Sequence, residues 1–347
     1  MPIYPHQQLR RYCISVFEAA GVPPDEAQVV GDALVDANLA GHDSHGIMRL
    51  PYYVNWIESG DFIPGAPFAV VSEADAFAVV DGGWGFGQVQ GRRAMEIAIA
   101  KARKAGASTV AGRNCTHLGR LGDYPRMAAE QGLAAVMYIN THGSGRLVAP
   151  FGGIERRLSA NPVAIGIPRK DAAPIVLDIS TCQIAEGKIR NMNTEGKPVP
   201  EGCIIDSEGQ PTTDAAKFYG PPQGALLPIA GHKGFGLGLA FDILAGAVSG
   251  AGCSRPDAKR IGNSFLMHVL DIERLRGSDP FSEDVEALID YVRSSRLAPG
   301  FDEILLPGEP ELRTEQDRRG NGVPVPEGTV TALNETATKY GVAGLVD

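Results

Sequence analysis

Four apolar segments with strand character decide the fold: 108-STVAG-112, 133-LAAVMYI-139, 162-PVAIGIP-168 and 174-PIVLDIS-180. Short apolar runs of this kind, separated by glycine, proline and polar residues, are typical of buried strands. The segment 124-YPRMAAEQ-131, between the first two, has helical character. Because strands alternate with helices here, the sequence predicts an α/β core.

Helices are expected on both sides of this core. Pro24, Asp25 and Glu26 suit the first turn of a helix, and apolar residues follow at helical spacing until Gly41. The predicted elements are helices in residues 1–60 and at 88–105, a strand at 77–81, a glycine-rich helix at 233–250, a strand at 264–272, a helix at 282–297, a charged stretch at 311–320 and a last helix within 324–341. This order predicts one helical lobe from both termini, residues 1–75 and 281–347, and an α/β domain over residues 76–280.

The composition is that of an ordinary globular protein. The 347 residues are 44% hydrophobic and 21% charged, which excludes wholesale disorder. The 32 Lys and Arg against 41 Asp and Glu give a net charge of −9, without a basic tract. We therefore expect no nucleic-acid partner and no membrane partner. The first residues contain no apolar segment of a secretory signal, so we expect a cytoplasmic protein.

Cysteines and histidines give no sign of a metal centre. The five cysteines are scattered and form no CxxC pair, which favours reduced thiols. The seven histidines show neither HExxH nor HxH spacing, so no metal site is predicted.

The segment 41-GHDSHGI-47, followed by Arg49, can carry chemistry. We expect it just past a helix, with His45 in an exposed position. A histidine there can exchange a proton near neutral pH, Ser44 can relay or orient that proton, and Arg49 offers a planar fork for a carboxylate. The alternative is a plain helix end, with His45 bonded to a carbonyl group and Arg49 on the surface.

Three further segments could contact a cofactor. The loop 114-NCTHLGRLGDY-124 follows a strand and opens a helix, where backbone N–H groups can meet a phosphate; a plain turn is equally compatible. Asp178 lies at a strand end and could hold a ribose hydroxyl, cap a helix or form an Asx turn. His232 and Lys233 enter the glycine-rich helix and could grip a pyrophosphate, or Lys233 could simply be solvated. No GxGxxG fingerprint follows a first strand, so a Rossmann site is not predicted.

Nine motifs in their order along the chain resemble one family. They are ANLAGHDSHGI at 37–47, FGQ at 86–88, the loop 114–124, APFGG at 149–153, ANP at 160–162, LDIS at 177–180 with AEGK at 185–188, PVPEGCIIDSEGQPTT at 198–213, HKGFGL at 232–237 and LLPGEPE at 305–311. Together they resemble the malate/L-lactate/ureidoglycolate dehydrogenase family over nearly the whole chain. The nearest branch is hydroxycarboxylate dehydrogenase B.

The resemblance implies a fold, a cofactor and an assembly. The family has a non-Rossmann nicotinamide-binding domain around a mixed β-sheet, a helical lobe from both termini, and a homodimer with composite sites. It implies NAD or NADP as cofactor; we expect NAD, because no arginine pair is evident for a 2′-phosphate.

The resemblance also implies roles for individual residues. His45 matches the family's proton donor and acceptor, Ser44 its relay partner, Arg49 its contact with the substrate carboxylate, and His117 a second catalytic histidine. The positions that match cofactor-contacting segments are Gly119, Arg120, Leu121, Asp178, Ile179, Ser180, His232, Lys233, Asn263, Pro307, Gly308 and Glu309.

Two departures from the family pattern bear on the substrate. Ala160 replaces the threonine of the usual GTNP, so a hydroxyl that contacts substrate is missing. Lys188 stands where the cyclic-imine reductase branch carries an aspartate, which disfavours cyclic ketimines. We expect a 2-hydroxyacid dehydrogenase acting on a malate-, lactate- or aryl-lactate-like acid. The alternatives are a cyclic ketimine reductase and a non-catalytic ligand-binding protein; a hydrolase is disfavoured because no GxSxG elbow exists.

Overall fold

A seven-stranded mixed sheet forms the centre of the molecule. The computed structural model describes residues 1–258 and 260–345. The strands, in spatial order, are β2 (Ala69–Ala74), β3 (Phe77–Asp81), β4 (Ala107–Cys115), β11 (Asn263–Asp271), β5 (Leu133–Asn140), β6 (Val163–Ile167) and β7 (Ile175–Ile179). β3 pairs with β4 in parallel, and the other pairs of this sheet are antiparallel. The predicted α/β class with a mixed sheet is confirmed.

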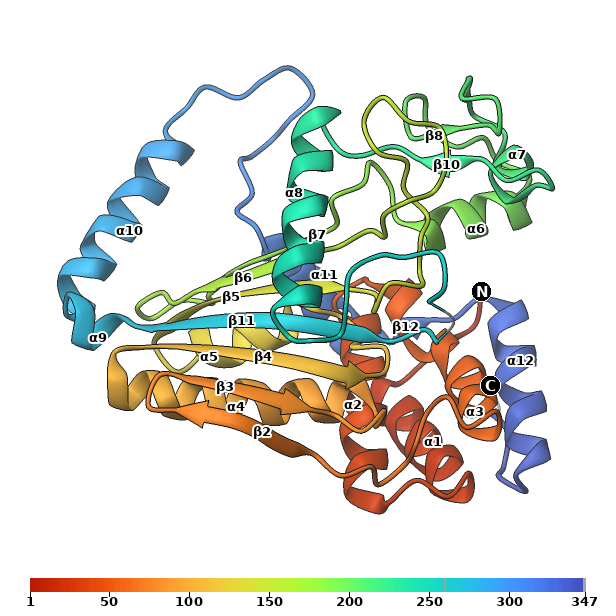
Figure 1. Cartoon of the computed structure of the whole chain (residues 1–347), viewed down its shortest axis with the longest axis horizontal. Helices are drawn as coiled ribbons and strands as arrows, with labels where there is room; N and C mark the ends of the chain where they lie inside the picture. The colour runs from red at the N-terminus through yellow and green to blue at the C-terminus, as the bar shows by residue number, and fades with distance from the viewer. Residues whose placement is uncertain (259, 346–347) are drawn as a thin grey trace.

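Helices cover both faces of this sheet (Figure 1). α4 (Gly87–Ala105) and α5 (Asp123–Ala129) pack on one face, over a core that includes the fully buried Met95, Met137 and Phe265. α4 ends at Gly106, which adopts φ +87° as expected for a helix stop. On the other face the glycine-rich helix is split into α8 (His232–Asp242) and a π-helical turn (Ile243–Ala247), which the sequence did not predict.

A helical lobe joins the two ends of the chain. α1 (His6–Ala19), α2 (Pro24–Leu39), α3 (Leu50–Glu58) and α12 (Glu327–Lys339) share one apolar core, and β1 (Ile3–Tyr4) pairs with β12 (Val323–Pro324). Within this core the Tyr12 hydroxyl donates to the Leu333 carbonyl at 2.6 Å. The predicted lobe from both termini is confirmed, whereas its boundaries at residues 75 and 281 stay a prediction.

The charged stretch at 311–320 is a helix, α11 (Glu309–Asn321), and not an irregular segment. It has no fully buried residue, so it lacks the apolar periodicity by which a helix is recognised. Ion pairs one turn apart, such as Arg319 with Glu315 at 2.6 Å, support it instead. α11 packs against α2, which brings the C-terminal part of the chain to the site described below.

The remaining elements lie at the periphery. α9 (Ile272–Leu275) leads into α10 (Ser278–Arg293), which begins and ends four residues earlier than predicted and extends away from the body in Figure 1. A small subdomain that the sequence did not predict contains β8 (Ile204–Ile205), β9 (Pro211–Thr212), β10 (Ala225–Leu226), α6 (Glu186–Glu195) and α7 (Ala215–Tyr219). In the described part of the chain, no helix is both long and apolar enough to cross a membrane.

Candidate active site

The segment 41-GHDSHGI-47 forms tight turns rather than a plain helix end. Two consecutive 3₁₀ turns, Asp43–His45 and Ile47–Arg49, connect α2 to α3. The Asn38 side chain ties them together, because its Oδ1 accepts from the Ile47 N–H at 2.8 Å and its Nδ2 donates to Asp43 Oδ1 at 2.6 Å. A Cβ on Gly46 would lie 2.2 Å from Asn38 Oδ1, so this position requires glycine.

Arg318 of α11 holds the same turns from outside. Its Nη1 and Nη2 contact Asp43 Oδ1 and Oδ2 at 2.7 and 3.1 Å, a bidentate ion pair between residues 275 positions apart. Arg318 also donates to the Asn38 carbonyl. Sequence reasoning missed Arg318, and nothing in its local sequence could have revealed it.

His45 is half-buried, so the expected exposed position is wrong. Its Nδ1 lies 3.0 Å from Ser44 Oγ, and the Arg49 Nε donates to the Ser44 carbonyl at 2.6 Å. Burial, together with the nearby cations Arg49 and Arg120 and with His42, lowers the pKa of His45 to about 3. The imidazole is therefore neutral at pH 7 and able to accept a proton.

The structure brings His117 to His45 from the other lobe. The two rings stack with centroids 5.5 Å apart and planes 16° apart. Burial, with added repulsion from Arg49 and His45, lowers the pKa of His117 well below its usual value. The four residues predicted to act on the substrate, namely Ser44, His45, Arg49 and His117, thus lie together where the helical lobe meets the sheet.

Two side chains behind His117 were not predicted as site residues. Gln88 Nε2 donates to the Tyr53 hydroxyl at 2.8 Å, and that hydroxyl lies 2.7 Å from His117 Nδ1. Gln88 belongs to the FGQ motif, which was the available signal. Tyr53 lies one helical turn after Arg49, but that spacing alone does not distinguish it from a core tyrosine.

The predicted cofactor segments converge on the loop that carries His117. The Leu118 N–H donates to Asn263 Oδ1 at 3.0 Å, and the Gly122 N–H donates to Asp178 Oδ2 at 2.8 Å. The Val176 N–H donates to the Pro307 carbonyl at 3.1 Å, and this bond joins the predicted segment 307–309 to β7, the strand that carries Asp178. Asp178 therefore binds the N-cap residue of α5, which is distant in the sequence, and closes no turn of its own.

The helix entry at residues 232–233 lies apart from these bonds. His232 and Lys233 are exposed at the first turn of α8, and the described residues show no hydrogen bond between them and the other predicted positions. Three residues before His232, the Ile229 N–H donates to the carbonyl of Thr181, the residue that follows Ser180, at 2.9 Å. Ile179 is 41% exposed at this end of β7.

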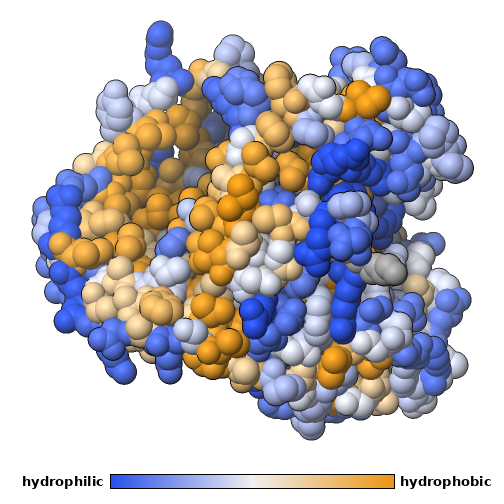
Figure 2. Space-filling model, viewed as in Figure 1, coloured by the Kyte–Doolittle hydropathy of each residue, from blue (hydrophilic) through white to orange (hydrophobic). Residues whose placement is uncertain are grey.

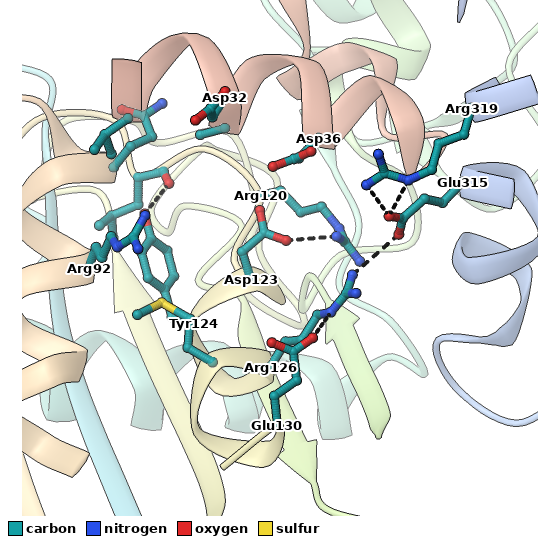
Figure 3. A pocket seen from close by; sticks show the side chains of 15 residues that line it. Asp32, Asp36, Arg92, Arg120, Asp123, Tyr124, Arg126, Glu130, Glu315 and Arg319 are labelled. Carbon is teal, nitrogen blue, oxygen red and sulfur yellow. Dashed lines mark hydrogen bonds and ion pairs between the residues drawn. The ribbon is translucent and has the colours of Figure 1, made fainter. Parts of the chain in front are cut away.

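Arg120 fits an anionic group of a bound ligand. Gly308 adopts φ +95°, and a Cβ there would lie 3.2 Å from the Val176 nitrogen, so glycine lets this segment pack closely against β7. The buried Nε of Arg120 has no hydrogen-bond partner among the described residues, while Nη1 pairs with Asp123 at 2.7 Å. Figure 3 shows Arg120 and Asp123 among the charged side chains around a cavity of about 290 Å³. In the described residues no cluster of His, Cys, Asp and Glu is placed to hold a metal ion.

Comparisons with known proteins agree on one family. A sequence model described as malate/L-lactate dehydrogenase matches residues 4–334. The malate dehydrogenase of Pyrococcus horikoshii is 38% identical over 98% of this chain and 96% of that protein. The hydroxycarboxylate dehydrogenase B of Escherichia coli K12 is 36% identical over 97% and 94%.

Solved structures are similar over the whole chain. Malate dehydrogenase from Pyrococcus horikoshii has a TM-score of 0.89 at 36% identity and covers 99% of this chain and 97% of that one. The Δ1-piperideine-2-carboxylate reductase from Pseudomonas syringae has a TM-score of 0.85 at 29% identity, covering 97% and 100%. The predicted family resemblance is confirmed.

Proposed function

The chain belongs to the malate/L-lactate dehydrogenase family and is an oxidoreductase, and from this premise we propose that it transfers a hydride between a nicotinamide cofactor and C2 of a 2-hydroxy or 2-oxo acid. One observation carries the proposal. A neutral His45 stacks on His117 beside Arg49, so a proton acceptor and a carboxylate-binding cation meet in one place. When bound, the nicotinamide supplies or takes the hydride at its C4 atom.

Arg49 would bind the substrate, and His45 with Ser44 would move the proton. Arg49 pairs with the substrate carboxylate and so sets which face of C2 is presented. In oxidation His45 Nε2 takes the hydroxyl proton, and Ser44 Oγ, 3.0 Å from Nδ1, orients the ring. In reduction the imidazolium of His45 returns the proton, and the bound carboxylate offsets Arg49, which after burial is one of the causes that lower the pKa of His45.

The nucleotide would lie along the segments that converge behind His117. The residues that would hold it are Gly119, Arg120, Leu121, Asp178, Ile179, Ser180, Asn263, Pro307, Gly308 and Glu309, with His232 and Lys233 near its phosphates. NAD is proposed over NADP on the sequence argument given above, and a cytoplasmic location stays a prediction.

A 2-oxo acid is proposed over a cyclic ketimine. Lys188 follows Gly187, whose Cβ would lie 3.0 Å from Ser44 Cβ, so the residue that differs from the imine reductase branch is adjacent to the site. Turnover of oxaloacetate, pyruvate, phenylpyruvate and Δ1-piperideine-2-carboxylate with NADH and NADPH would rank these classes. A ketimine turned over faster than the three oxo acids would reverse this choice.

We also propose a homodimer. Figure 2 shows apolar side chains lining a hollow between α10 and the body of the molecule. The exposed apolar residues of these elements are Leu288, Tyr291 and Val292 on α10, and Leu237, Leu239 and Ile243 on and next to α8. An apolar surface of this kind marks an interface. Because the family resemblance implies a dimer with composite sites, a second copy of this chain is the proposed occupant.

His45→Ala is expected to lower kcat/KM for the best 2-oxo acid by about 100-fold or more, because general acid–base catalysis is lost. Cofactor binding, followed by NADH fluorescence, stays unchanged. His268→Ala is the control, since His268 lies on β11, where its ring contacts the Thr109 hydroxyl, and it is not one of the predicted site residues. His45→Ala activity within about threefold of wild type would contradict the assignment of the proton acceptor.

Arg49→Lys is expected to raise KM for the 2-oxo acid about 10-fold or more, because a bidentate guanidinium contact becomes a point charge. The dissociation constant of NADH is the internal control and remains unaffected. If KM for the 2-oxo acid does not change, Arg49 is not the carboxylate clamp.

Dilution tests the dimer. An obligate interface buries about 2,000 Å² or more in total, so mass photometry at nanomolar concentration is expected to show dimers, with specific activity falling wherever monomers appear. A monomer that keeps full specific activity would exclude a composite active site.

A further inference from the structure

A buried hydrogen-bond chain leads from α4 through α3 to His117. Gln88 is 3% exposed and Tyr53 is fully buried, and the chain runs from Gln88 Nε2 to the Tyr53 hydroxyl at 2.8 Å and on to His117 Nδ1 at 2.7 Å. Because a hydroxyl and an imidazole can each donate or accept, these two distances alone do not place the protons.

A backbone amide shows which atoms donate and which accept in this series of hydrogen bonds. The Gly119 N–H also points at His117 Nδ1, at 3.3 Å, and a backbone N–H can only donate. His117 Nδ1 must therefore offer its lone pair. The Tyr53 proton is then directed to Nδ1, and the Tyr53 oxygen accepts from the Gln88 amide.

The proton of neutral His117 consequently lies on Nε2, an atom that has no hydrogen-bond partner within the described residues. Building on the function proposed above, we propose that His117 serves as a fixed neutral hydrogen-bond donor, through Nε2, to an oxygen of the substrate. Tyr53 and Gln88 are the positioning residues that hold it in this tautomer. His45 alone exchanges the proton, so the two stacked histidines have different roles.

The surroundings of the chain agree with these proton positions. Burial, together with Arg49 and His45, depresses the pKa of His117, which keeps the ring neutral at pH 7. Burial raises the pKa of Tyr53 to about 12, so its hydroxyl keeps the proton that it donates. A Cβ on Gly119 would lie 3.1 Å from Gln88 Nε2, and Gly119 has φ +73°, so glycine here lets the amide of Gln88 and the loop pack together.

These hydrogen bonds also give a role to Gln88 of the FGQ motif at 86–88, which has no part in the reaction itself. Gln88 touches neither His45 nor Arg49 by any hydrogen bond in the described chain, and its donor reaches the site only through Tyr53. Its second amide atom, Oε1, is buried without a partner among the described residues. The hydrogen bond that Gln88 donates to Tyr53 is therefore the contact through which Gln88 acts on the site.

Long-range ¹H–¹⁵N NMR of ¹⁵N-histidine protein reports the tautomer without any substrate. At pH 7 wild-type His117, assigned by its loss in His117→Gln, is expected to be neutral and protonated on Nε2. Tyr53→Phe and Gln88→Met are expected to shift this signal toward a mixture of tautomers, because the Gly119 N–H that remains, at 3.3 Å, holds Nδ1 more weakly than the Tyr53 hydroxyl at 2.7 Å. Tyr12→Phe is the control, since it removes a buried tyrosine hydroxyl bonded to the Leu333 carbonyl and leaves the chain intact. An Nδ1-protonated or cationic His117 in the wild type would overturn the proposal.

Steady-state kinetics of the same variants test the consequence for turnover. Tyr53→Phe is expected to lower kcat about 10-fold or more, with the NADH dissociation constant and the thermal midpoint close to those of Tyr12→Phe. An unchanged kcat in a Tyr53→Phe protein whose tautomer has shifted would overturn the donor role alone. Absence of turnover of every 2-oxo acid by the wild type would instead defeat the proposed function, while the NMR result would still decide the tautomer.

Discussion

The loop between β4 and α5 is buried where the helical lobe meets the sheet, and its backbone N–H groups must find partners there. Buried amides without partners cost about 1–3 kcal/mol each. Asn263 accepts from Leu118, Asp178 accepts from Gly122, and the Thr116 hydroxyl accepts from the Gly87 N–H at 3.0 Å. These bonds tie β11, β7 and α4 to a single loop, so the position of His117 is set by three separate elements.

The turns that carry His45 depend on the C-terminal part of the chain, which packs back against the N-terminal helices. α11 packs against α2, and Arg318 closes on Asp43, so the turns that carry His45 are held by residues from both ends of the sequence. In GHDSHGI the aspartate and the second glycine therefore have structural roles, whereas His45 stacks on His117 and Ser44 contacts the His45 ring. The site exists only when lobe and sheet are docked, which links catalysis to the integrity of that contact.

Local sequence signals predicted the elements whose apolar pattern is regular. The strands β5, β6 and β11 lie within two residues of their predicted ranges, and Gly106 ends α4 in the left-handed conformation. α11 was not predicted as a helix because none of its residues is fully buried, so it has no apolar periodicity. The strands of the small subdomain were not predicted because they are only two residues long. The site residues came from motif resemblance, since the contacts Arg318–Asp43 and Tyr53–His117 join distant positions. The burial of His45 could not be inferred, because it depends on docking of the loop from the other lobe.

We propose that a hydride passes directly to C2 of a 2-oxo acid at this site. The most direct measurement uses NADH and NADPH deuterated at C4, in each of the two stereochemical forms, with oxaloacetate, pyruvate and phenylpyruvate. Deuterium is predicted at C2 of the hydroxy acid product, from one of the two forms only, because a nicotinamide bound in one orientation presents a single face to the substrate. Retention of all deuterium on the nucleotide with every 2-oxo acid would contradict the account.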